Sequence, residues 1–214
     1  MAGVSGATVI AGAVGHAPNG GPSNSAVTVN QLGKELSRYD KVNLVPFGEF
    51  VPFPFKQVTN QISTEAGEFE AGQNVVVTNI GKHRTGTFIC YESVFPSFVR
   101  QFAKSGAEVL VNISNDGWFG KSAARYQHLR IVRMRAVENR RWILRATNNG
   151  VTAVIDPAGR LVTKGPEYVE AALNTRFGYL SGTTFYTEYG DWFVVVCGLA
   201  MVVGLVRHYF QSAS

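Results

Sequence analysis

The chain carries a long apolar segment near its C-terminus, and this segment limits the folds that are open to it. The 15 residues from Trp192 to Val206 carry no charge and are followed by Arg207. A helix that crosses a bilayer needs about 20 apolar residues, with a lower limit of roughly 17. Tyr209 and Phe210 supply the missing length if the Arg207 side chain reaches back to the interface, and a helix in a protein core is seldom apolar on every face. We therefore expect a transmembrane helix over residues 188–210, a tail over 211–214 and a separate domain over 1–187.

The rest of the chain has the pattern of one α/β domain. Runs rich in β-branched residues predict strands, and a stretch with Pro and Phe over residues 44–54 predicts an ordered loop packed against an apolar surface. Periodic apolar positions predict two helices, the second with Leu129 on its buried side and Arg125 on another side. This alternation of strands and helices indicates an α/β fold. The expected strands are 7–13, 26–30, 75–78, 87–90, 108–114, 142–147 and 152–155, with a loop over 15–25, and the expected helices are 93–104 and 122–140.

Charge and composition narrow the possible partners. The net charge is +5, but the basic residues are scattered apart from one cluster between Arg125 and Arg145, and no nucleic-acid motif accompanies them. A membrane surface or a phospholipid headgroup therefore suits the charge, and we expect no nucleic acid. Cys90 and Cys197 lie in such different surroundings that a disulfide is not expected. The four histidines show no metal-ligand spacing, so we predict no metal and no cofactor.

Cys90 stands where an apolar strand ends. We expect the next helix to begin with Ser93 as its N-cap and with Pro96 in its first turn. A strand-to-helix corner holds a side chain out of the sheet, near backbone N–H groups that stabilise a developing anion. A thiol at such a corner is favoured as a nucleophile. A buried core cysteine is the other interpretation, and these residues alone leave both open.

Acyl transfer through a cysteine also needs a base, a group that stabilises the oxyanion, and a proton for the leaving group. Lys41 is a candidate cation because it lies at the mouth of the Pro-rich loop, although a surface lysine fits the pattern equally well. Glu49 and Glu92 are candidates for carboxylates that orient the lysine or the start of the helix. For each glutamate, a solvated surface charge is the plainer alternative.

Several dense motifs then resemble one family, the bacterial apolipoprotein N-acyltransferases, which are membrane-bound members of the nitrilase superfamily. The segment Tyr39–Pro52 resembles the family's lysine segment, Ile89–Ser93 its nucleophile segment, and Asn112–Gly120 the loop that follows. Residues 127–150 resemble its next helix and strand, and Gly190–Trp192 matches the start of its last transmembrane span. The motifs occur in the family's order, and the resemblance extends from about Ala7 to Val206.

The resemblance implies a fold and a chemistry. The fold is a nitrilase-like α-β-β-α sandwich followed by a C-terminal transmembrane helix. Cys90 would carry a fatty acyl group as a thioester, Lys41 would stabilise the oxyanion, Glu49 and Glu92 would support them, and Tyr91 would border the acyl site. The donor would be a membrane phospholipid, and the acceptor the α-amino group of a lipoprotein's diacylglyceryl-cysteine. The protein would lie in the bacterial inner membrane, with its catalytic domain on the periplasmic side and its C-terminus in the cytoplasm.

The sequence departs from the family pattern at one point. The superfamily triad also contains a general-base Glu well before the lysine, but residues 1–34 contain no Asp or Glu, and Glu35 is only six residues before Lys41. We therefore expect this chain to be the C-terminal portion of such an enzyme, without its general base. Two alternatives remain open: a nitrilase-type amidase that uses water as the acceptor, and a catalytically silent, membrane-anchored binding module.

Overall fold

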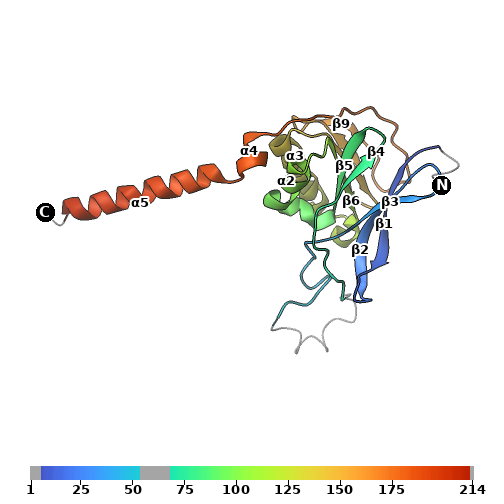
Figure 1. Cartoon of the computed structure of the whole chain (residues 1–214), viewed down its shortest axis with the longest axis horizontal. Coiled ribbons are helices and arrows are strands. Elements are labelled where there is room, and N and C mark those ends of the chain that lie inside the picture. Colours follow the sequence, from blue (N-terminus) through green and yellow to red (C-terminus); the bar gives the residue numbers. More distant parts are fainter. Residues whose placement is uncertain (1–5, 54–67, 213–214) are drawn as a thin grey trace.

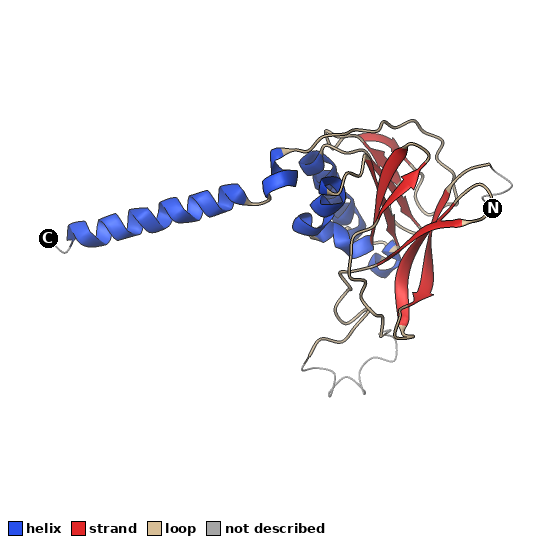
Figure 2. Ribbon diagram, in the orientation of Figure 1, coloured by secondary structure: helices blue, strands red, loops and turns tan. Residues whose placement is uncertain are grey.

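Two β-sheets, a pair of helices and one projecting helix make up the protein (Figures 1 and 2). The computed structural model describes residues 6–53 and 68–212. The sheets pack face to face, and helices α2 (Pro96–Lys104) and α3 (Ala124–Asn139) cover the larger sheet. The mixed α/β fold and the C-terminal apolar helix are thereby confirmed. The described residues supply an α-β-β order of layers and no helix on the outer face of the smaller sheet.

The smaller sheet is an antiparallel meander. Its strands are β1 (Val9–His16), β2 (Pro22–Val29) and β3 (Glu35–Asp40). The loop expected over residues 15–25 is wrong, because β1 and β2 pair without a break from Val9 opposite Val29 to His16 opposite Pro22. Only residues 17–21 form the turn, since long-range pairing outweighs the weak strand preference of Gly, Ser and Asn here. Pro22 is tolerated because it is the terminal residue of its strand.

The larger sheet has six strands, and the carboxyl ends of its three parallel strands lie at one edge. Strands β5, β6 and β7 are parallel to one another, whereas β4, β8 and β9 join antiparallel. The carboxyl ends of neighbouring parallel strands lie at the same edge of a sheet, which is where α/β proteins place their sites. In spatial order the strands are β4 (Val77–Ile80), β5 (His83–Ile89), β6 (Val109–Ser114), β7 (Ile143–Thr147), β8 (Ala153–Ile155) and β9 (Leu161–Lys164).

The two long helices bury apolar faces on this sheet. Phe102 of α2 and Val132 of α3 are fully buried, and Phe88 of β5 lies between the layers in the same core. Gly86 lets α2 approach closely, because a Cβ at that position would lie 2.9 Å from the Cβ of Phe102. This packing fixes the position of the carboxyl end of β5 relative to the two helices.

Helix α2 begins later than the sequence suggested. Residues Cys90–Val94 form a 3₁₀ turn, η3, and the helix starts at Pro96 with Phe95 in the N-cap position. The prediction of Ser93 as the N-cap is wrong for a physical reason. Proline excludes the preceding residue from the helical region, and Phe95 is accordingly extended, with φ −99° and ψ 91°. Pro96 itself suits the first helical position, where no N–H is needed.

Arg125 of α3 also departs from expectation, because its side chain is buried rather than solvated. Its guanidinium lies over the rings of Tyr126 and Tyr168, 4.8 Å and 4.5 Å from their centroids, and 3.1 Å from Glu167. Stacked aromatic faces and one carboxylate cover the charge, an arrangement that suits the flat guanidinium.

Helix α5 (Trp192–Ser212) leaves the domain and contacts little of it (Figure 1). None of its residues is buried, and it is long and apolar enough to cross a membrane. The short helix α4 (Phe185–Tyr189) connects it to the domain and packs on α2 and α3. Thr187 of α4 is fully buried, so α4 belongs to the domain and the chain leaves it after Gly190.

Candidate active site

Lys41 follows β3 directly, and its side chain is inaccessible to solvent. Its Nζ donates to both carboxylate oxygens of Glu49, at 2.9 Å and 2.7 Å. Glu49 is itself held by the side-chain amide of Asn24 and the backbone N–H of Val45, both at 2.7 Å. The structure therefore excludes a solvated surface lysine and a solvated Glu49. A buried ion pair of this kind is a costly arrangement that needs good geometry, and here both partners are fixed.

The carboxylate of Glu92 has different hydrogen-bond partners from that of Glu49. It is fully buried and accepts four hydrogen bonds, from the Tyr39 hydroxyl at 2.5 Å and from the backbone N–H groups of Val42, Asn43 and Ile89 at 2.8, 3.2 and 2.7 Å. Three of these donors flank Lys41, and the fourth directly precedes Cys90. One carboxylate therefore ties the lysine segment to the cysteine turn. Burial raises the pKa of Glu92, and these same donors oppose that rise.

Cys90 is the first residue after β5 and has an unusual backbone conformation. Its φ is +48°, in the left-handed region that residues other than glycine rarely enter. Its side chain is half-buried and packs against the edge of the core. Such outliers gather at functional sites, where the surrounding structure imposes them. Tyr91 follows in η3, half-buried, with its ring edge-on to Phe95 at 5.2 Å between centroids.

Comparison with known proteins decides the family. Residues 1–175 match the family described as carbon-nitrogen hydrolase. The chain belongs to the carbon-nitrogen hydrolase family. It is also similar to proteins named apolipoprotein N-acyltransferase. It is 40% identical to the one from Geobacter metallireducens, over 85% of this chain and 36% of that protein. It is 36% identical to the one from Thermotoga maritima, over 86% of this chain and 37% of that protein. The chain thus spans little more than a third of the length of these relatives.

Solved structures share the carbon-nitrogen hydrolase fold. A glutamine-dependent NAD+ synthetase from Acinetobacter baumannii superposes with a TM-score of 0.61 at 16% identity, over 77% of this chain and 30% of that one. A mutant of the amidase from Nesterenkonia sp. AN1, with acrylamide added at its active site cysteine, gives 0.57 at 21% identity, over 76% of this chain and 60% of that one. At such identities these likenesses establish the fold alone.

This carbon-nitrogen hydrolase domain has a buried polar network beneath Cys90 that the sequence reasoning did not identify. The histidines, His128 among them, were considered only as metal ligands, and neither Asp116 nor Arg145 was given a role. In the structure, His128 Nε2 lies 3.1 Å from the carbonyl oxygen of Cys90 and 2.9 Å from Ser93 Oγ. Its Nδ1 lies 3.1 Å from Asp116 Oδ1, and Asp116 Oδ2 accepts from Arg145 at 2.5 Å. The signal in the sequence was a charged residue, Arg145, in the middle of an otherwise apolar strand.

The charged groups of the network stabilise one another in their ionised forms. Burial alone would raise the pKa of Asp116, but hydrogen bonds from His128 and Ser114 and the positive charge of Arg145 lower it to about 2. Burial lowers the pKa of Arg145, and the nearby Asp116 carboxylate opposes that change. Arg145 also donates to the side-chain oxygen of Asn112 on β6. The carboxyl ends of β6 and β7 are therefore joined by buried charged groups next to the Cys90 turn.

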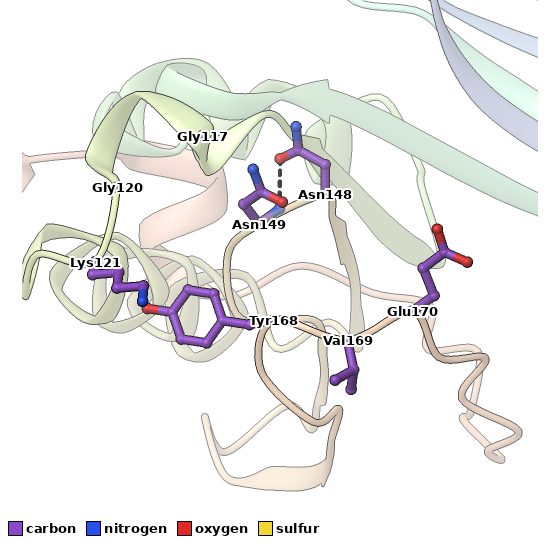
Figure 3. A pocket seen from close by; sticks show the side chains of 8 residues that line it. All are labelled: Gly117, Gly120, Lys121, Asn148, Asn149, Tyr168, Val169 and Glu170. Atoms are coloured by element: carbon purple, nitrogen blue, oxygen red, sulfur yellow. Dashed lines mark hydrogen bonds between the residues drawn. The ribbon is translucent and has the colours of Figure 1, made fainter.

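An open pocket of about 330 Å³ adjoins this network (Figure 3). Neither Cys90 nor Lys41 lines it. The backbone N–H of Asp116 donates to the side-chain oxygen of Asn148 at 3.1 Å, so the floor of the pocket is continuous with the network. The lining residues are polar or small for the most part: Gly117, Gly120, Lys121, Asn148, Asn149, Tyr168, Val169 and Glu170.

Proposed function

We propose that this chain forms the catalytic part of an apolipoprotein N-acyltransferase. The observation that carries the proposal is the junction made by Glu92, which joins the segment of the buried Lys41–Glu49 pair to the turn of Cys90. The names of the relatives and the exposed apolar helix α5 support the same activity. An enzyme that acts on a membrane lipid benefits from an apolar anchor, whereas an enzyme that acts on a small soluble amide does not need one.

The first half of the reaction forms a thioester. The Cys90 thiol gives its proton to the general base of the enzyme, and its sulfur attacks the ester carbonyl carbon of a phospholipid, forming a C–S bond. The ammonium of Lys41 stabilises the oxyanion, and Glu49 holds that ammonium in position. Collapse of the intermediate breaks the ester C–O bond, and the lysophospholipid leaves after its alkoxide takes that proton back from the general base. Tyr91, beside Cys90, borders the bound acyl chain.

The second half transfers the acyl group. The α-amino group of a lipoprotein's diacylglyceryl-cysteine attacks the thioester, an amide forms, and the Cys90 thiolate leaves. The attacking amine must give up a proton to a base. Among the described residues, Glu49 is engaged by Lys41, and Glu92 is engaged by four donors. We therefore propose that the general base of the complete reaction is not among the described residues.

We further propose that α5 spans the bacterial inner membrane. Arg207 and His208, near its end, would then lie on the cytoplasmic side, as the preference for basic residues there suggests. The domain before α5 would lie on the periplasmic side, where maturing lipoproteins present their amino groups. The net charge of +5 suits contact with anionic lipid headgroups.

Intact-mass spectrometry with phospholipid vesicles and a diacylglyceryl lipopeptide tests the proposal. We expect the 214-residue chain to be alkylated at Cys90 by iodoacetamide but not to acylate the lipopeptide. Fusion of the upstream part of the Geobacter metallireducens relative to this chain is expected to restore N-acylation. Cys90→Ala should abolish both behaviours, whereas Cys197→Ser should change neither.

Other outcomes separate the alternatives. N-acylation by the 214-residue chain alone would contradict the missing base and point to Glu35, Glu49 or Glu92. A fusion that hydrolyses amides but leaves the lipopeptide unmodified would be an amidase. A fusion that binds lipid without acylating either Cys90 or the lipopeptide would be a silent binding module.

A further inference from the structure

We propose that His128 is a positioning residue that holds the Cys90 turn in its reactive conformation through a hydrogen bond to the Cys90 carbonyl. This inference rests on the proposed role of Cys90 as the nucleophile, and it assigns a function to a side chain that the mechanism above does not use. His128 belongs to α3, and its Nε2 lies 3.1 Å from the carbonyl oxygen of Cys90 on η3.

The direction of this hydrogen bond follows from its partners. A carbonyl oxygen can only accept, so Nε2 must carry the hydrogen. The hydroxyl of Ser93, at 2.9 Å, can share that hydrogen as a second acceptor. At Nδ1, Asp116 Oδ1 lies at 3.1 Å and Arg145 Nη2 at 3.2 Å. Asp116, an acceptor, suits a protonated Nδ1, and Arg145, a donor, suits an unprotonated one. Nε2 carries a hydrogen in both states.

The imidazole is well fixed for this task. His128 and Asp116 are both buried, and the ring of Phe119 meets the imidazole edge-on at 5.6 Å between centroids. Asp116 is held in turn by Ser114 Oγ at 2.6 Å and by Arg145 at 2.5 Å. The donor therefore has one orientation, and it points at the turn that carries Cys90.

The need for such a donor comes from the backbone of Cys90. A residue other than glycine at φ +48° is strained and persists only where its surroundings impose that conformation. The Cys90 carbonyl and the Tyr91 N–H belong to one planar peptide. The bond from His128 therefore fixes the direction of that N–H as well as the direction in which the thiol leaves the strand. Without the bond, the turn can relax and the direction of the thiol changes.

Two substitutions test the hydrogen bonds of the two imidazole nitrogens separately. The amide nitrogen of a glutamine reaches about as far as Nε2, whereas that of an asparagine reaches about as far as Nδ1. His128→Gln thus keeps a donor for the Cys90 carbonyl, and His128→Asn keeps contact with Asp116 only. The readout is the second-order rate of Cys90 alkylation by iodoacetamide, measured by intact mass in the full chain in detergent. Cys197→Ser in every variant leaves Cys90 as the one remaining thiol.

We expect His128→Asn to slow alkylation about tenfold, as the loss of one hydrogen bond allows, and His128→Gln to stay within about threefold of the parent. Thr187→Val is the matched control, because it removes a buried hydrogen bond to Asn139 of the same helix without touching the network. It should lower the melting temperature but leave the alkylation rate within about twofold. Ser93→Ala should also stay within about twofold, since the Cys90 carbonyl keeps its donor.

The proposal is overturned if folded His128→Asn reacts at the parental rate, or if Thr187→Val slows alkylation as much as His128→Asn does. If His128→Asn does not fold, the other variants still decide. A folded His128→Gln or Ser93→Ala protein that reacts about tenfold more slowly than the parent would also overturn it. A parent whose Cys90 resists iodoacetamide contradicts the proposed function, whereas a reactive parent with unchanged variants contradicts this inference alone.

Discussion

The ammonium group of Lys41 has three hydrogens, and two of them are directed at Glu49. Among the described residues, no other acceptor is bonded to Nζ, so one hydrogen would remain for the oxyanion that we propose to form at Cys90. A buried lysine held in this way needs little rearrangement when negative charge develops. Its effect should therefore appear in the rate of acylation more than in the affinity for lipid.

We expect Lys41→Ala to lower the rate of Cys90 acylation by about 100-fold to 1000-fold in the fused protein. Lys41→Arg should not rescue it, because a planar guanidinium cannot replace a compact ammonium in a closed site. The exposed Lys34→Ala serves as the matched control and should react at the parental rate. An acylation rate of Lys41→Ala within about threefold of the parent would show that the assigned role is wrong.

Glu92 provides a prediction about stability. One carboxylate oxygen accepts from Tyr39, Val42 and Asn43, and the other accepts from Ile89. Glu92→Gln would place an amide NH₂ against one of these donors. We expect it to lower the free energy of unfolding by about 1–3 kcal/mol, measured by urea denaturation in detergent. Glu188→Gln, at a surface pair with Lys104, should change it by less than about 0.5 kcal/mol. Equal effects of the two substitutions would contradict the junction.

Asp116 makes stability depend on pH in a defined direction. Its carboxyl group has a pKa of about 2 in the fold, below its usual 3.8, so the ionised form is favoured in the folded state. The resulting stabilisation is present above about pH 4 and is lost as the pH falls through about 2. We expect the free energy of unfolding of the parent to fall more steeply over this range than that of Asp116→Asn. Parallel pH profiles would contradict the ionised network.

Among the elements, five of the six strands of the larger sheet were predicted and its edge strand β9 was not, and in the smaller sheet β3 was missed. Short apolar runs such as Val109–Ser114 carry a strong local signal. The paired length of β1 and β2 depends on contacts across the sheet, which local preference does not contain. The start of α2 was predictable in principle, because Pro96 restricts Phe95, but Ser93 offered a plausible cap and was chosen instead.

The candidate-site residues that lie in sequence motifs were predictable. The contacts between residues far apart in the sequence were not. Cys90, Lys41, Glu49 and Glu92 were all selected from the sequence, and their roles stay predictions. The contact between His128 and Cys90 joins residues 38 positions apart, and that between Arg145 and Asp116 joins residues 29 apart. No spacing rule for a helix or a strand connects such residues, so the network beneath Cys90 required the structure.

The loop over residues 44–53 is a second element with a testable property. Phe53 is 88% exposed and Phe47 is 55% exposed, whereas Phe50 is half-buried. Phe55, the next phenylalanine along the chain, lies outside the described residues. Exposed aromatic rings on a loop suit contact with a lipid surface, because their apolar area is otherwise left in water.

We expect the combined substitution of Phe50 and Phe53 by Ser to weaken vesicle binding by about tenfold or more, since each buried Phe contributes roughly 1.5–3 kcal/mol. The measurement is vesicle sedimentation of the chain cut after Gly190, so that α5 does not dominate binding. Leu32→Ser, at a 90% exposed position in the β2–β3 turn, is the control and should bind as the parent does. Unchanged binding with Phe50 and Phe53 both replaced would count against a lipid contact.

The whole molecule combines a packed domain with a helix that shares none of its core. Side chains of α5 such as Val194 and Leu199 are more than 60% exposed, in a row that no described residue covers. Monomeric proteins in water rarely expose apolar patches of this extent. The domain itself is closed at α4, where the backbone carbonyl of Thr187 accepts from Arg100 at 2.9 Å and its hydroxyl donates to Asn139 at 2.9 Å.

The last prediction therefore concerns where the chain can be divided. A boundary at residue 188, as expected from the sequence, falls inside α4, so we choose a cut after Gly190, which keeps Thr187 in place. We expect the chain cut there to be soluble and monomeric without detergent, and the full chain to sediment with membranes until detergent releases it. A cut after Gly182 is the control: it removes α4 and should lower the melting temperature, because Arg100 and Asn139 lose buried partners. A full chain that stays monomeric in buffer would contradict a transmembrane α5. If both the full chain and the chain cut after Gly190 need detergent, the domain itself must hold a lipid-binding surface, and the aromatic loop over residues 44–53 is where that surface should be sought.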